Sequence, residues 1–175
     1  MMTRALVAVL AFGIVGGISA SERDALVRFR GGIGVAPVAN VAGPVNADGT
    51  FQNVKQNIVR GVLPAGPWRI ADLRADVDVY GHIRVRGHGL LLASGNNIGQ
   101  NANASVFATL FCEAAAPFVA HNTAPEGVPL EPNGDFRIDD TLSPPPPSDC
   151  ASPVLLIRNT GGLWFAAGIQ QLGDD

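Results

Sequence analysis

Residues 70–93 alternate between apolar and charged side chains, and this stretch constrains the fold more than any other part of the chain. From position 72 to position 79 every second side chain is apolar and the others are charged. This pattern is typical of a strand with one face buried and the other in water. The alternation resumes after residues 80–82, with Ile83 and Val85 on the apolar face. The sequence therefore predicts an antiparallel β-hairpin.

A three-residue turn at residues 80–82 sets the register of this hairpin, because it keeps the two apolar faces in phase and places Val79 opposite Ile83. The same register pairs opposite charges across the two strands: Asp78 with Arg84, and Asp76 with Arg86. Such cross-strand pairs contribute about 0.2 to 1 kcal/mol each. On this prediction the charged face neutralises itself, and the hairpin serves as scaffold.

The first twenty residues have the composition of a secretory signal peptide. Arg4 precedes an apolar run at residues 5–15, and small residues follow up to Ala20. An uncleaved membrane anchor is the alternative, but the run is shorter than the roughly 20 residues that a span needs. Cleavage after Ala20 predicts a mature domain of residues 21–175, periplasmic or secreted, without a transmembrane segment.

The size and composition of the mature chain indicate one domain built from short strands. Its 155 residues are enough to bury about 70% of the unfolded surface. The 21 Gly and 13 Pro are typical of many strands joined by tight turns. The formal net charge is −3, and it is one unit more negative without Arg4, so nucleic acid is a poor partner.

Alternating or apolar segments predict further strands at residues 26–38 and 51–63, and a strand buried on both faces at residues 106–112. Two further hairpins are expected at residues 128–142 and 154–169. No stretch after the signal shows a helical period. We therefore predict a single antiparallel β-sandwich of about seven to nine strands, with a partly open β-barrel as the alternative.

Cys112 and Cys150 are the two cysteines of the chain. An even count in an exported protein predicts a disulfide between them. A catalytic or metal-binding thiol pair is the alternative, but the spacing is not CxxC and no histidine motif is near.

The polar loop at residues 94–105 is the candidate ligand-binding segment. Its amide side chains offer both donors and acceptors, as sugar hydroxyls require, and a rigid sandwich commonly carries recognition loops of this kind. The candidate residues are Asn96, Asn97, Gln100, Asn101 and Asn103. A disordered polar connection is the alternative, since no aromatic side chain lies in the loop to stack on a sugar ring.

Three carboxylates around the expected hairpin at residues 128–142, Glu131, Asp135 and Asp139, form a candidate calcium site. We expect no other cofactor. The three histidines, His82, His88 and His121, are expected to be ordinary surface residues, because none has a partner at ligand spacing in the sequence. We predict no catalytic residue.

Five segments carry a resemblance to other proteins: DLRADV, GLLLASGN, SVFATLFCEAAAPF, PLEPNGDFRIDD and CASPVLLIRN. Together with the expected signal peptide, they resemble small exported hypothetical proteins of bacteria with no assigned activity. The resemblance spans most of the mature chain and implies no site residues.

These features favour a non-enzymatic binding or interaction module, with a glycan or a protein as its partner. A structural component of the cell envelope or of an extracellular assembly is the alternative, in which an exposed strand edge pairs with a neighbour. A hydrolase is the third hypothesis and the weakest, because the sequence holds no recognisable Ser, His and Asp set or pair of catalytic carboxylates.

Overall fold

The computed structural model describes residues 25–36, 47 and 57–173. The expected signal peptide and residues 51–56 of the strand expected at residues 51–63 lie outside this part. The strand prediction is wrong for residues 57–63, which form a tight turn in which Val59 and Val62 exchange two backbone hydrogen bonds. The described part contains no helix, and its strands are β1 (Ala25–Gly34), β2 (Trp68–Arg69), β3 (Asp72–Asp78), β4 (His82–His88), β5 (Leu91–Leu92), β6 (Ser105–Phe111), β7 (His121–Asn122), β8 (Val128–Pro129), β9 (Phe136–Thr141), β10 (Val154–Asn159) and β11 (Trp164–Gln170).

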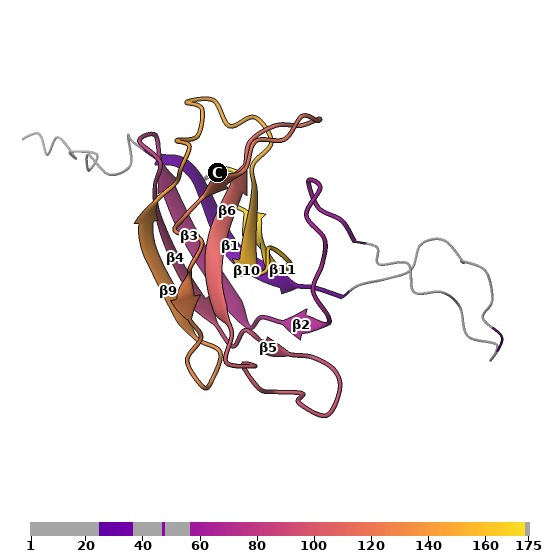
Figure 1. Cartoon of the computed structure of the whole chain (residues 1–175). Coiled ribbons are helices and arrows are strands. Elements are labelled where there is room, and N and C mark those ends of the chain that lie inside the picture. The colour runs from indigo at the N-terminus through magenta and orange to yellow at the C-terminus, as the bar shows by residue number, and fades with distance from the viewer. Residues whose placement is uncertain (1–24, 37–46, 48–56, 174–175) are drawn as a thin grey trace, which may run out of the picture.

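Nine of these strands form one antiparallel sheet, in the order β7-β6-β10-β11-β1-β3-β4-β9, with β8 also paired to β6 (Figure 1). The sheet curls until its two ends meet. Asn122 N–H donates to the Ser143 carbonyl oxygen at 3.0 Å, and Ser143 N–H donates back at 2.8 Å. The predicted all-β antiparallel fold is confirmed. A sandwich and a partly open barrel both describe this nearly closed sheet.

The core lies inside the curled sheet. Alternate residues of β3 and β4 are buried there, and β6 is buried on both faces as predicted. A second layer covers β11 from outside. Trp68 of β2 stacks on Phe165 with ring centroids 4.0 Å apart, and Trp164 Nε1 donates to the Asn57 carbonyl oxygen at 3.0 Å.

β3 and β4 form the predicted hairpin, but the predicted register is wrong by two residues. Val77 lies opposite Ile83. The turn occupies residues 79–81, because Asp78 Oδ1 accepts the N–H groups of Tyr80 and His82, each at 2.9 Å. Gly81, with φ +85°, provides the left-handed third position. A shift of two residues leaves the buried and exposed faces unchanged, so alternation alone cannot detect it.

The predicted hairpin at residues 154–169 is confirmed by the pairing of β10 with β11, whereas that at residues 128–142 is wrong. β8 pairs with β6, placing Val128 opposite Val106. Gly127 permits this close approach, because a Cβ there would lie 2.6 Å from the Val106 carbonyl oxygen.

The predicted disulfide between Cys112 and Cys150 is confirmed, with their Cα atoms 4.5 Å apart. Cys112 follows β6 directly, and Phe111 lies opposite Val154 at the start of β10. The bond therefore extends the β6–β10 ladder and closes the loop that contains β7, β8 and β9.

Candidate ligand-binding surface

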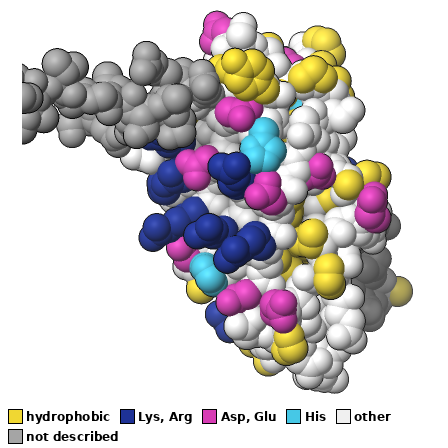
Figure 2. All heavy atoms as spheres, turned by 90° about the vertical axis from the view of Figure 1, so that its left-hand side faces the viewer, with side chains coloured by type: hydrophobic (Ala, Val, Ile, Leu, Met, Phe, Trp, Pro, Cys, Tyr) yellow, Lys and Arg dark blue, Asp and Glu magenta, His cyan; other side chains and the backbone are white. Residues whose placement is uncertain are grey.

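The outer face of β1, β3, β4 and β9 carries most of the charged side chains of the described chain. Figure 2 shows Lys and Arg gathered in a band on this side of the molecule, with Asp and His between them. Their position follows from the strand alternation, because each inward apolar residue is followed by an outward charged one.

Four arginines lie directly opposite one another across the four strands. The register pairs Arg30 with Arg74, Arg74 with Arg86, and Arg86 with Arg137. We call these four residues the arginine row. Since neighbouring strands lie about 4.8 Å apart, the row spans about 14 Å. Like charges placed directly opposite are destabilising, so this arrangement costs folding free energy.

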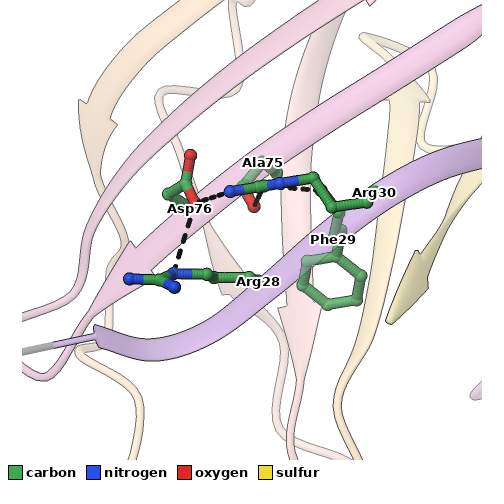
Figure 3. A network of polar contacts seen from close by, with 5 residues as sticks. All are labelled: Arg28, Phe29, Arg30, Ala75 and Asp76. Atoms are coloured by element: carbon green, nitrogen blue, oxygen red, sulfur yellow. Dashed lines mark hydrogen bonds and ion pairs between the residues drawn. The ribbon is translucent and has the colours of Figure 1, made fainter. Parts of the chain in front are cut away.

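Arg30, at one end of the row, is held down on the sheet (Figure 3). Its Nη1 donates to the carbonyl oxygens of Phe29 at 2.8 Å and Ala75 at 3.1 Å. Its Nη2 donates to Asp76 Oδ1 at 2.6 Å, and Arg28 Nε lies 3.8 Å from the same oxygen. The Asp76 carboxylate is therefore occupied by β1, and not by the hairpin arginine that the sequence predicts.

The other end of the row has free positive charge. Arg74 contacts Asp72 through Nε at 3.3 Å. The guanidinium groups of Arg86 and Arg137 are exposed, and neither has an ion pair or hydrogen bond within the part of the chain that the structure describes. The predicted self-neutralisation of the charged face is therefore wrong.

Carboxylates border the arginine row on both sides, and each is already paired. On one side Asp139 contacts His82 Nε2 at 2.7 Å and Arg84 Nε at 3.5 Å. On the other side Asp135 contacts His88 Nδ1 at 3.1 Å. A polar hollow of about 330 Å³ adjoins the row where Arg28, Arg30, Asp76, His82 and Arg84 meet. Among the described residues of this face, the arginines without an ion pair are thus Arg86 and Arg137, both in the row.

The hydrogen bond from His88, supported by the N–H of Gly89, holds the pKa of Asp135 below its ordinary value of 3.8. A lowered pKa in the folded state stabilises the fold above the unfolded-state pKa, and this stabilisation is lost as the pH falls through the folded value. We expect Asp135→Asn to be less stable than the wild type at pH 6, with the difference shrinking below about pH 4. Urea unfolding across this range measures the difference, and a gap that stays constant with pH contradicts the prediction.

The polar loop forms hydrogen-bonded turns, in which Gly99 N–H donates to Leu92 O at 2.9 Å and Gln100 N–H to Asn97 O at 3.1 Å. Asn101 has a structural role. Its Nδ2 donates to the carbonyl oxygens of Leu130 and Glu131, both at 3.0 Å, and its Oδ1 accepts the Asn103 N–H. The side chains of Asn96, Asn97, Gln100 and Asn103 are exposed. Ligand binding by this loop stays a prediction.

The candidate calcium ligands do not converge. Within the described residues no group of three or more His, Cys, Asp or Glu side chains could hold a metal ion. Asp135 and Asp139 are separated by four residues of extended chain, which places their Cα atoms about 13 Å apart. Each carboxylate contacts a histidine of β4. The backbone N–H of Glu131 donates to the carbonyl oxygen of Asp135, and this hydrogen bond closes the turn before β9.

The histidines divide into two kinds. His82 and His88 lie on the outer face as expected, but each contacts a carboxylate of the β9 segment. The expectation that His121 is a surface residue is wrong. It is 4% exposed in β7, where Nδ1 contacts the Pro144 carbonyl oxygen at 2.8 Å, and Nε2 has no partner among the described residues.

The fold and this surface define an all-β protein with a cationic row across one sheet face. No protein-family model, curated protein or solved structure matches the chain. Among the described residues there is also no helix long and apolar enough to span a membrane.

Proposed function

We propose that this protein is a non-enzymatic exported binding module, and that it binds an anionic ligand on the outer face of β1, β3, β4 and β9. The observation that carries this proposal is the pair of exposed, unpaired guanidinium groups of Arg86 and Arg137 on adjacent strands. A guanidinium group presents a planar fork of donors that matches a carboxylate, sulfate or phosphate.

The energetics of the face support a binding role. Three consecutive cross-strand pairs of arginines oppose folding. Asp76 and Asp72 pair with Arg30 and Arg74, and Asp139 and Asp135 pair outside the row, so no carboxylate is paired with Arg86 or Arg137 in the part of the chain that the structure describes. A bound anion offsets this repulsion and satisfies the free donors. Export agrees with the expected signal peptide and with the disulfide, which is typical of oxidising compartments.

Retention on immobilised dextran sulfate tests the proposal. We expect the wild type to bind at low salt and the R86A/R137A variant to bind at least about tenfold more weakly, because each lost charge-assisted hydrogen bond is worth about 1.5 kcal/mol or more. Arg69→Ala is the matched control, since Arg69 is exposed in β2 outside this face. If both variants bind like the wild type, or if the wild type is not retained, the proposed function is wrong.

A further inference from the structure

We infer that the anionic ligand is a linear acidic polysaccharide, and that it lies along the arginine row, across the strands. This inference rests on the proposed function and names the class of ligand for the same surface. It follows from the width of the row, its length and the kinds of side chain around it.

The row is one residue wide. Along each strand the next outward side chain lies only about 6.6 Å away, two residues on. On one side the neighbours alternate in charge across the strands, in the order Arg28, Asp76, Arg84 and Asp139, and each of these arginines contacts one of these carboxylates. On the other side Asp72 lies beside Arg74. Asp135 adds a fourth carboxylate beside Arg137. A broad anionic surface, such as a lipid bilayer or duplex nucleic acid, meets these carboxylates as soon as it covers the row. A ligand with its charges in single file avoids them.

The row is also long and regular. It places four arginine positions on four consecutive strands, about 4.8 Å apart over about 14 Å. The guanidinium groups of Arg86 and Arg137 are unpaired among the described residues, and Arg74 extends the row through its exposed side chain. A single small anion contacts one or two of these groups, whereas a polymer with one charge on each repeating unit contacts several, and its separate contacts act together.

The surrounding chemistry favours sugars over nucleobases. Sequence-tolerant binding of single-stranded nucleic acid uses aromatic side chains as stacking platforms. None of the outward-facing side chains of β1, β3, β4 and β9 is Phe, Tyr or Trp. The bordering carboxylates of Asp72 and Asp76 are hydrogen-bond acceptors, which suit the hydroxyl groups of a sugar whose own carboxylate contacts arginine.

Calorimetric titration with galacturonate, trigalacturonate and hexagalacturonate tests this inference. We expect affinity to rise from the monomer to the hexamer by at least tenfold. We also expect the hexamer to bind more tightly than oligothymidylate of equal charge or vesicles of phosphatidylglycerol. A hexamer that binds no better than the monomer, or that is outcompeted by either of the other polyanions, overturns the inference.

Arg84 and Arg86 provide a matched pair of variants, because they lie two residues apart on the same face of β4, and only Arg86 belongs to the row. We expect Arg86→Ala to weaken hexamer binding at least fivefold and to reduce the slope of log affinity against log salt by about one. Arg84→Ala should stay within twofold of the wild type. Equal losses in the two variants contradict a single-file ligand.

Two readouts separate the possible failures. Because Arg86→Ala relieves repulsion within the row, it should not lower the melting temperature, so a loss of binding is not a loss of fold. If dextran sulfate still binds through Arg86 and Arg137 while galacturonate length has no effect, the face binds anions through local charge alone, and only the inference of a linear ligand lying along the row falls. If no polyanion binds the wild type, the proposed function falls with it.

Discussion

Replacing Cys112 and Cys150 together by serine is expected to lower the free energy of unfolding by about 4 kcal/mol. The two cysteines are separated by 38 positions, and the bond restricts the unfolded chain over this whole loop. The loop contains β9, which the sheet holds through its ladder with β4 and through the bridge between Asn122 and Ser143. Loss of the bond therefore favours unfolding of the sheet as a whole, including the strand that carries Arg137.

Urea unfolding of the wild type with and without dithiothreitol measures this contribution. Reduction should shift the wild-type midpoint to that of the C112S/C150S variant, and the variant itself should not respond to the reductant. A wild-type midpoint that is insensitive to reduction under unfolding conditions would show that the bond contributes little. Binding to dextran sulfate should weaken in the variant only at temperatures or urea concentrations where β9 has separated.

The features that could be predicted from the sequence are those encoded locally. Alternation over residues 72–88 is enough to define two half-buried strands, because each side chain reports its own face. In residues 106–111 the side chains on both faces are largely apolar, which likewise identifies a strand without a solvent-exposed face. The even number of cysteines is enough to identify the disulfide.

The register depends on turn chemistry, and here a usable signal was present. Asp78 precedes the turn and Gly81 ends it, which is the pattern of a three-residue hairpin loop whose last residue is left-handed. Placing Gly81 at the third loop position gives the observed register. The functional interpretation changes with it, since Arg86 then lies opposite Arg74 and not opposite Asp76.

The complete arginine row could not be predicted, because it depends on which strands flank the hairpin. β1 precedes β3 by more than thirty residues and β9 follows β4 by nearly fifty, and no local pattern states that they are its neighbours. The same limit applies to His82 and His88, whose carboxylate partners come from the β9 segment. The spacing of residues in the sequence predicts contacts within one segment. This surface is formed by pairing between strands that are far apart in the sequence.

Replacing Gly34 by alanine is expected to destabilise the protein by about 3 kcal/mol or more. A Cβ at this position overlaps the carbonyl oxygen of Trp68 and lies 2.7 Å from the Cα of Arg69. These are backbone atoms, so no side-chain rotation can relieve the clash. The strand end must move away from β2, which breaks the hydrogen bond from Trp68 N–H to the Val35 carbonyl oxygen.

Gly66→Ala is the matched control for this substitution, because a Cβ at Gly66 meets no atom within 4 Å and its backbone is not left-handed. We expect Gly66→Ala to stay within about 0.5 kcal/mol of the wild type. Thermal and urea unfolding of the two variants should therefore differ widely, and the near-ultraviolet circular dichroism of Gly34→Ala should change because Trp68 loses its stacking on Phe165. Equal stability of the two variants would mean that β1 and β2 do not approach as closely as the structure shows.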